Sequence, residues 1–362
     1  MLAVPNRGQD WCDPSSRLHF RPASGRTSNT HCDQESSLLA SHTRRALVIS
    51  AERRMKSLKM HPTRCPISGE EGDATEMYPA NFDASSLSPA VFSARRLPDG
   101  IHYRIVRSNR SGLVRSDPVA DTALINELYA QSSFHYADEI PSLKNTYERY
   151  LERVCALGCE RGSLLEIGCG NGFFLERARE RGFKNVWGVE PSHRAIKHAS
   201  PTIRESLVCD VMRPNLFSAN AFDLICMFHI LDHIAEPNQL LAECYRVLKP
   251  GGFILCLNHN VESWSARILG EKSPIIDIEH TYLYSHTTIR RIFEINGYEA
   301  KEQGNVWNTY SITYLFHLLP LPHVLKQTSL RALKASAFGT LPLTFPLGNL
   351  YLIARKPIWP SG

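Results

Sequence analysis

The sequence predicts an α/β protein whose second half folds as one doubly wound, mostly parallel sheet with helices on both faces. Two observations carry this prediction. From about residue 161 onward, short apolar segments alternate with segments of helical periodicity. The first apolar segment, residues 164–167, is followed directly by Gly168, Gly170 and Gly172. Short apolar strands joined by helices indicate parallel pairing with both faces of the sheet covered.

The first 60 residues differ in composition from the rest of the chain. They are rich in Ser and Arg and lack sustained periodicity, which is typical of a disordered segment or of an over-long start to the reading frame. A mitochondrial presequence is the alternative, but Asp10, Asp13, Asp33 and Glu35 are acids that such segments avoid.

The charge balance and the cysteines exclude several classes of partner. Residues 1–60 hold ten Lys/Arg against five Asp/Glu, so subtraction from the totals of 41 and 36 leaves 31 of each in the remainder. A neutral folded part gives no reason to expect a nucleic-acid partner. The ten cysteines are scattered without repeated pairing, which favours free thiols in a reducing, cytoplasmic compartment. No stretch reaches the ~18 uninterrupted apolar residues of a membrane span.

Two further regions precede the sheet. Residues 61–118 contain short β-prone pieces at 101–107 and 112–115 and are expected to form a small β-rich module. Residues 119–160 are expected to be a helical lead-in, with helices at 121–131 and 143–157.

The α/β domain is expected over residues 161–362. Its strands are expected at 164–167, 186–189, 207–209, 222–228, 253–257 and 350–354, and its helices at 173–181, 191–198, 237–248 and 285–296. An apolar, proline-punctuated segment at about 310–345 lies between the last two strands. It is expected to be a helical hairpin that packs on the sheet, or a cap suited to an apolar acceptor or a weak membrane-surface contact.

The glycine turn and a later carboxylate indicate a nucleoside site. Glycine allows positive φ and close approach of a ligand to the main chain. The dinucleotide fingerprint would need a third glycine at position 173, where Phe173 stands, so the spacing disfavours NAD or FAD. Glu190 ends the second strand 18 residues after Gly172, where a carboxylate can accept hydrogen bonds from both ribose hydroxyls.

Later motifs make the pattern specific. Cys209-Asp210 follows the third strand, the fourth strand leads into Asp232-His233, and the next helix ends in Lys249-Pro-Gly-Gly. In this order the motifs resemble the class I S-adenosylmethionine-dependent methyltransferases, in the small-molecule branch that includes the ubiquinone-pathway O-methyltransferases. The resemblance implies a Rossmann-like methyltransferase sheet of seven strands, the last of them antiparallel.

By the same resemblance, S-adenosyl-L-methionine is the expected cofactor. Phe228 and His229 would border the transferring methyl group, and His233 and His280 are the candidate bases for a hydroxyl acceptor. No metal is expected, because His229 replaces the first acid of the E-x-x-E-H pattern that some relatives use to bind one. Glu190 would hold the ribose of the cofactor, and Asp210 would hold the adenine. The methionine end would be held by Glu166, Gly168, Gly170 and Gly172.

The N-terminal module resembles a zinc-ribbon attachment that has lost its ligands. Its two knuckle-like segments keep only Cys65, while Ser68, Ser108 and Ser111 stand at the other ligand positions. Because serine hydroxyls are poor zinc ligands, the module is expected to keep the fold without the metal.

Methyl transfer to a small-molecule acceptor, with a hydroxyl oxygen as the expected site, is therefore the leading hypothesis. C-methylation of a sugar or similar metabolite is the nearest alternative. A nucleotide-dependent oxidoreductase and a non-catalytic cofactor-binding protein are the rivals from other classes. The acceptor's identity and the oligomeric state stay open at this point.

Overall fold

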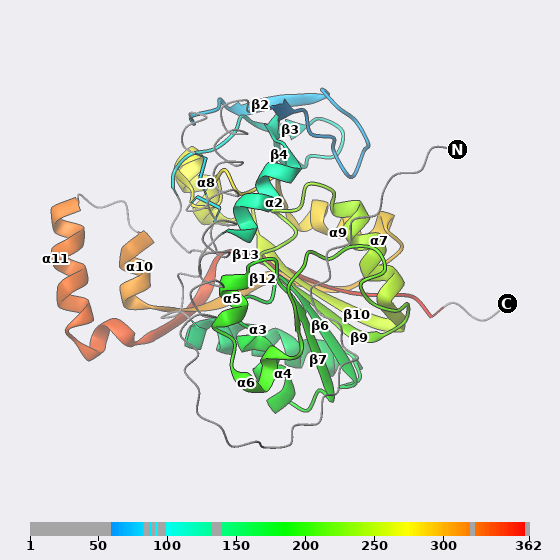
Figure 1. The fold of residues 1–362 in the computed structure, drawn as a ribbon. Coiled ribbons are helices and arrows are strands. Elements are labelled where there is room, and N and C mark those ends of the chain that lie inside the picture. The colour runs from blue at the N-terminus through cyan, green and yellow to red at the C-terminus, as the bar shows by residue number, and fades with distance from the viewer. Residues whose placement is uncertain are drawn as a thin grey trace, which may run out of the picture. The chain divides into compact units, whose positions relative to one another are not determined.

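The computed structural model describes residues 59–82, 87–88, 91–92, 99–131, 140–318 and 323–358 (Figure 1). Apart from residues 59 and 60, the N-terminal segment 1–60 lies outside these ranges, so its predicted disorder is not addressed. No helix in the ranges is long and apolar enough to cross a membrane.

A seven-stranded sheet organises the chain. Its strands lie in the order β12-β13-β10-β9-β6-β7-β8, and β13 runs antiparallel to both of its neighbours while the other pairs are parallel. This confirms the predicted seven strands with an antiparallel last strand. The bounds are β6 Ser163–Ile167, β7 Asn185–Val189, β8 Leu207–Val208, β9 Phe222–Phe228, β10 Leu248–His259, β12 Glu299–Ser311 and β13 Pro342–Arg355.

Helices cover both faces of the sheet. Successive residues of a strand point to opposite faces, so neighbouring strand residues pack against different helices. Leu164 packs in one apolar core with residues of α3 and α4, whereas Leu165 packs in another with residues of α7 and α9. The two cores explain why the strands are apolar without alternation. The helices are α2 Thr122–Ala130, α3 Ile140–Ala156, α4 Phe173–Glu180, α5 His193–Lys197, α6 Pro201–Arg204, α7 Pro237–Val247, α8 Trp264–Leu269, α9 His286–Ile295, α10 Ile312–Leu318 and α11 His323–Lys334. Two short 3-10 helices are η3 Gly270–Lys272 and η4 Ala337–Thr340.

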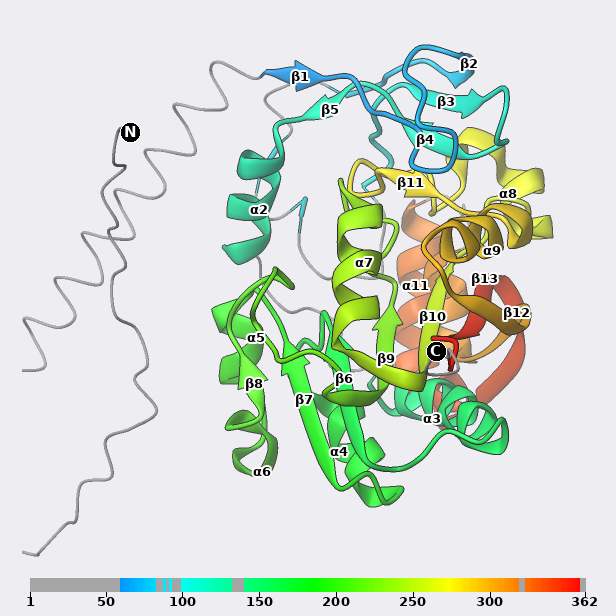
Figure 2. The same cartoon turned by 90° about the vertical axis from the view of Figure 1, so that its right-hand side faces the viewer.

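A smaller sheet stands beyond the carboxyl ends of the parallel strands. Its order is β11-β4-β3-β2, and a separate pair joins β1 to β5. In Figure 2 the arrowheads of β7 and β9 point toward the half that holds this small sheet. The bounds are β1 Met60–His61, β2 Ala74–Tyr78, β3 Ile105–Ser108, β4 Val114–Ser116, β5 Val119–Ala120 and β11 Tyr282–Leu283. Because β11 comes from the second half of the chain, the β-rich N-terminal residues are tied to it by backbone pairing.

The positions that resemble zinc-ribbon ligands come together around one thiol. Cys65 is buried, and its Sγ lies 3.1 Å from Ser111 Oγ. Burial alone raises the pKa of the Cys65 thiol, but the surrounding serines, Ser111 foremost, outweigh it and bring the pKa to about 7. A hydrogen-bonded cluster thus occupies the positions at which the sequence resembles a zinc ribbon.

An arm, residues 307–346, extends from the edge of the sheet. β13 pairs with β10 only from Asn349 onward, whereas its earlier residues pair with β12 alone as a two-stranded ribbon, from Trp307↔Pro346 to Ser311↔Pro342. The ribbon carries α10, α11 and η4, which project to the left of the sheet in Figure 1. The predicted last strand, 350–354, was therefore too short. The segment expected at 310–345 is a helical hairpin, but α10 and α11 project beyond the sheet.

Candidate active site

A large cavity opens at the carboxyl ends of the parallel strands. Its volume is about 980 Å³, and its wall includes the glycine turn after β6, the tips of β7 and β9, helix α2, and residues of α8 and α10. Open parallel sheets bind ligands beyond the carboxyl ends of their strands. The cavity is large enough for a nucleoside cofactor at one end and a second molecule at the other.

The turn after β6 has a backbone that only glycine adopts without strain. Gly168, Gly170 and Gly172 have φ of 71°, 56° and 76°. A Cβ on Gly168 would also lie 2.1 Å from Ile230 Cδ1. Gly172 then caps α4, which begins at Phe173. Gly168 and Gly170 line the cavity, so a ligand there meets bare main chain.

Glu190 is fixed at the tip of β7 by two backbone amides. The Gly170 N–H donates to its Oε2 (3.0 Å) and the Ser192 N–H donates to its Oε1 (2.8 Å). Burial raises the pKa of Glu190, although these two hydrogen bonds oppose the shift. Each carboxylate oxygen keeps a further lone pair for a hydroxyl donor in the cavity.

Glu166 lies behind the turn and does not belong to the described cavity wall. Its side chain is buried, and its Oε2 has no hydrogen-bond partner among the described residues. Burial, and then the nearby Glu190, raise the pKa of Glu166 well above its usual range. A buried carboxyl group with an unsatisfied oxygen suits a cationic ligand group, such as an α-ammonium, next to the turn.

Asp210 has two roles, as part of the cavity wall and as a cap of its own loop. It lines the cavity, while its Oδ1 accepts from the Val211 N–H (2.8 Å) and its Oδ2 pairs with Arg213 Nε (2.8 Å). The carboxylate thus caps its own loop and faces the cavity, so it is available to a ligand only beside Arg213.

Phe228 and His229 end β9 at the cavity wall. The Phe228 ring stacks on Tyr147 of α3 with a centroid distance of 4.0 Å. His229 adopts a φ of 56°, a left-handed conformation that is uncommon for residues other than glycine and that often occurs at functional sites. Both residues therefore stand where the sequence placed them, at the end of the fourth strand.

Asp232 is the centre of a histidine cluster beside this strand end. It is fully buried, and three imidazoles approach its carboxylate: His259 Nδ1 at 2.6 Å, His233 Nε2 at 3.6 Å and His280 Nε2 at 3.9 Å. Burial alone raises the pKa of Asp232, but the three histidines outweigh burial and hold it well below its usual range. The group is therefore a buried carboxylate anion.

The two predicted bases, His233 and His280, lie in this cluster but are held by other partners. His280 Nδ1 donates to the Ile275 carbonyl (2.8 Å), and burial lowers the pKa of His280 to about 3. His233 Nδ1 lies 2.8 Å from the Tyr129 hydroxyl and 3.1 Å from the Glu279 carbonyl, and burial lowers the pKa of His233 as well. A histidine whose pKa is so reduced is a weak proton acceptor.

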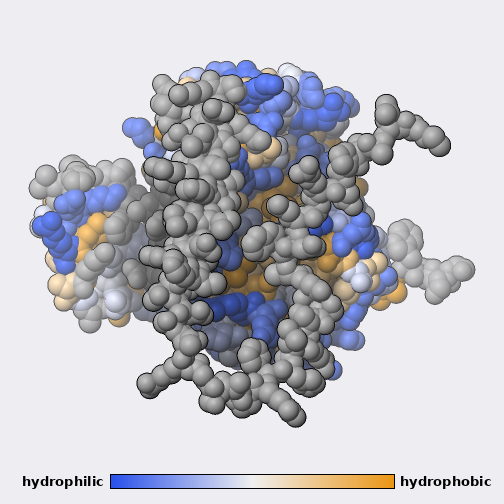
Figure 3. Space-filling view, in the orientation of Figure 1, coloured by the Kyte–Doolittle hydropathy of each residue, from blue (hydrophilic) through white to orange (hydrophobic). Residues whose placement is uncertain are grey.

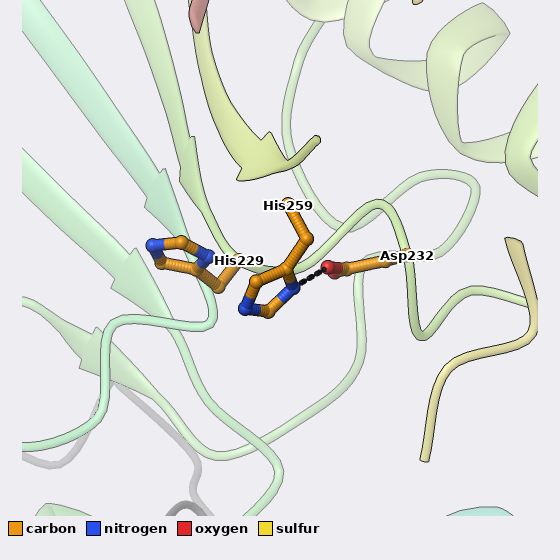
Figure 4. A group of neighbouring side chains, drawn as sticks. All are labelled: His229, Asp232 and His259. Atoms are coloured by element: carbon orange, nitrogen blue, oxygen red, sulfur yellow. Dashed lines mark hydrogen bonds and ion pairs between the residues drawn. The ribbon is translucent and has the colours of Figure 1, made fainter. Parts of the chain in front are cut away.

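His259 was not predicted from the sequence, but its geometry suits a base better than that of His233 or His280. It ends β10, lines the cavity, and its Nδ1 lies 2.6 Å from Asp232 Oδ2, as the dashed line in Figure 4 shows. Since a carboxylate only accepts, Nδ1 donates to Asp232, and in the neutral ring the lone pair is then on Nε2. The side chain is 23% exposed, and its second ring nitrogen points away from Asp232 (Figure 4). Its position at the carboxyl end of the fifth strand was the available signal.

The same cluster offers metal-ligand geometry. The ligand atoms of His229, Asp232 and His259 lie within 4.8 Å of one another, as do those of Asp232, His233 and His280 (Figure 4 shows the first set). Imidazole and carboxylate donors suit several divalent ions. The absence of a metal stays a prediction.

Comparison with known proteins finds similarity to methyltransferases. Residues 140–303 match a family model described as a methyltransferase domain. The ubiquinone biosynthesis O-methyltransferase of Idiomarina loihiensis is 32% identical over 109 residues, 28% of this chain and 44% of that protein. The protein of the same name from Nitrosomonas europaea is 26% identical over 158 residues, 40% of this chain and 66% of that protein. The chain spans about half the length of most of the curated relatives that it matches.

Solved structures align with lower similarity. A SAM-dependent methyltransferase from Archaeoglobus fulgidus has a TM-score of 0.41 and 20% sequence identity, with 65% of this chain and 100% of that chain covered.

Proposed function

We propose that this chain, whose residues 140–303 form a class I S-adenosylmethionine-dependent methyltransferase domain, transfers a methyl group to a hydroxyl oxygen of a small, largely apolar acceptor. The observation that carries the choice of oxygen is the Asp232–His259 pair, in which a buried carboxylate holds Nδ1 of a histidine that lines the cavity. A hydroxyl acceptor must lose a proton during methyl transfer, and a base of this kind accepts it.

The cofactor would lie along the glycine turn. Gly168 and Gly170 offer bare main chain, Glu190 would accept from the ribose hydroxyls, and Glu166 would face the α-ammonium of the methionine end. Asp210 would accept from the adenine end. When bound, S-adenosylmethionine supplies an electrophilic methyl group that passes to the acceptor oxygen as the S–CH₃ bond breaks and the O–CH₃ bond forms.

The chain's own residues would manage the proton and the orientation. His259 Nε2 accepts the hydroxyl proton, and Asp232 stabilises the resulting imidazolium through Nδ1. Tyr129 and His233, linked at 2.8 Å, also line the cavity and would orient the acceptor. Such positioning of the reacting groups supplies much of the rate enhancement.

The cavity wall supports an acceptor with a ring and apolar substituents. Aromatic and aliphatic side chains dominate the part of the wall away from the glycine turn: Tyr129, Trp264, Ile268, Leu315 and Phe316. The matched relatives are named for O-methylation in ubiquinone biosynthesis. A hydroxylated aromatic ring is therefore the acceptor class that we propose.

Calorimetric titration with S-adenosylhomocysteine tests the cofactor site. Wild-type protein should bind it and should not bind NAD. Gly168→Ala should abolish binding, because its Cβ has no room beside Ile230. Gly158→Ala is the matched control: Gly158 also has positive φ, 94°, but a Cβ there meets nothing within 4 Å and it lies outside the described cavity wall. Equal affinity in Gly168→Ala and Gly158→Ala would refute the site.

A further inference from the structure

The arm exposes an unusual amount of apolar surface. Leu325 of α11 is 56% exposed, and Phe338 of η4 is 65% exposed. Leu341 and Leu343 are also exposed. In Figure 3 the arm, at the left, shows hydrophobic residues in orange directly beside hydrophilic residues in blue. Clustered exposed apolar side chains mark interaction sites more often than isolated ones do.

The charge of this region has one sign. No Asp or Glu follows Glu302 in the chain, whereas α11 alone carries Lys326, Arg331 and Lys334. Residues 61–362 are neutral overall, so the net positive charge of this region comes from its lack of acids rather than from an excess of cations. Apolar side chains mixed with Lys and Arg, without acids, are typical of helices that lie on anionic membrane surfaces.

The exposed apolar surface continues to the cavity. Trp264 and Ile268 of α8 are 56% and 74% exposed, and both also line the cavity. The Trp264 Nε1–H donates to the Pro346 carbonyl (3.2 Å), which joins α8 to the base of the arm. Leu315 and Phe316 of α10 form the neighbouring wall. The arm and α8 thus border the same side of the cavity.

We propose that the arm and α8 form a docking surface for an anionic lipid bilayer. Lys326 and Arg331 contact the headgroups, while Leu325, Phe338 and Ile268 enter the interface. This orientation turns the apolar end of the cavity toward the membrane. Direct entry of an apolar acceptor from the bilayer rests on the proposed function, but lipid binding itself does not.

Vesicle flotation with the full-length protein tests the proposal. The protein should float with vesicles of phosphatidylcholine mixed with phosphatidylserine, and less with phosphatidylcholine alone or at high salt. Lys326→Glu/Arg331→Glu should lower the partition coefficient at least about fivefold per charge. Lys184→Glu/Lys301→Glu changes the net charge equally at exposed sites outside the arm and should leave binding almost unchanged.

Apolar contact is tested separately. Leu325→Ser/Phe338→Ser should reduce flotation at high salt, where charge contributes little, and should leave S-adenosylhomocysteine affinity unchanged. Wild-type protein that stays unbound with either vesicle, or equal flotation of the arm and control variants, would overturn the proposal. So would sedimentation showing that the arm substitutions dissociate a dimer without changing vesicle binding, because a second copy would then cover this surface.

Discussion

Replacing Asp232 with Asn tests the proposed base directly. The substitution keeps the size of a fully buried side chain but removes the charge that His259 Nδ1 contacts at 2.6 Å. A hydrogen bond to a charged group contributes about 1.5–3 kcal/mol, or roughly a 10–150-fold effect. If the amide NH₂ faces Nδ1, the ring changes tautomer and Nε2 loses its lone pair; the same change in a Ser-His-Asp triad lowers kcat about 10⁴-fold. We therefore expect kcat to fall between about 10² and 10⁴-fold.

The assay is transfer of isotope-labelled methyl from S-adenosylmethionine to a hydroxylated aromatic acceptor, with S-adenosylhomocysteine affinity measured in parallel and expected to stay within about twofold. Asp223→Asn is the matched control. Asp223 is also buried and charged, but it pairs with Lys249 at 2.8 Å at the start of β9, away from the cavity. This control should lower the free energy of unfolding and leave kcat unchanged.

A double-mutant cycle sharpens the test. His259→Gln alone should cost about as much as Asp232→Asn, and the double variant little more, because the two residues act as one unit. Fully additive losses, or an Asp232→Asn enzyme within about threefold of wild type, would refute the reasoning.

The remaining predictions concern the cofactor, pH and metals. Glu190→Gln should weaken S-adenosylhomocysteine binding roughly 10–150-fold by calorimetry, and an unchanged affinity would remove Glu190 from the site. Burial lowers the pKa of His280 from 6.5 to about 3, so the unfolded state binds the proton more tightly than the folded state does. The contribution of His280 to stability is therefore full above about pH 6.5 and falls in more acidic solution. Chemical denaturation at about pH 5 should show a loss of about 2 kcal/mol from this residue, and His280→Asn should reduce that loss. The pKa of Asp232 is also lowered, so its contribution to stability is present above about pH 3.8 and is lost in more acidic solution. Turnover should survive a strong chelator, whereas loss of activity restored by a divalent ion would assign a metal to the histidine cluster. The substitutions Ser68→Cys, Ser108→Cys and Ser111→Cys, together with Cys65, would give the N-terminal module four thiols. This variant should bind zinc in a colorimetric competition assay, and a folded variant that does not bind zinc would contradict the zinc-ribbon resemblance.

The sequence predicts the sheet well because its signals are local. The strand at residues 222–228 was placed at its observed bounds, since it is apolar except for Asp223 and buried on both faces. The turn at Gly168 was equally clear, because its φ of 71° favours glycine. These features depend on residues that are neighbours in the chain.

Two strands were predicted too short because pairing overrides local propensity. The strand predicted at 253–257 spans Leu248–His259, and His259 pairs with Asn349 of β13. The strand predicted at 350–354 begins at Pro342, although Pro342, Pro346 and Gly348 disfavour a strand. The two prolines destabilise the strand little, because this part of β13 pairs with β12 alone and proline is tolerated in edge strands.

The histidine cluster shows what a single sequence could not indicate. His259 and His280 lie 27 and 48 residues after Asp232, at the end of a strand and in a loop, and only the fold brings them together. Asp232-His233 was recognisable by its place after the fourth strand. The choice among the histidines required hydrogen-bond partners and burial, which are tertiary properties.

The most direct measurement follows a ¹³C-labelled methyl group from S-adenosylmethionine into an acceptor drawn from a panel of hydroxylated aromatic compounds. The methyl resonance of the product distinguishes attachment to oxygen from attachment to carbon or nitrogen. We predict an O-methyl signal that wild-type protein produces and His259→Gln nearly abolishes. A C-methyl or N-methyl signal, or an O-methyl signal that His259→Gln produces at the wild-type rate, would contradict the account.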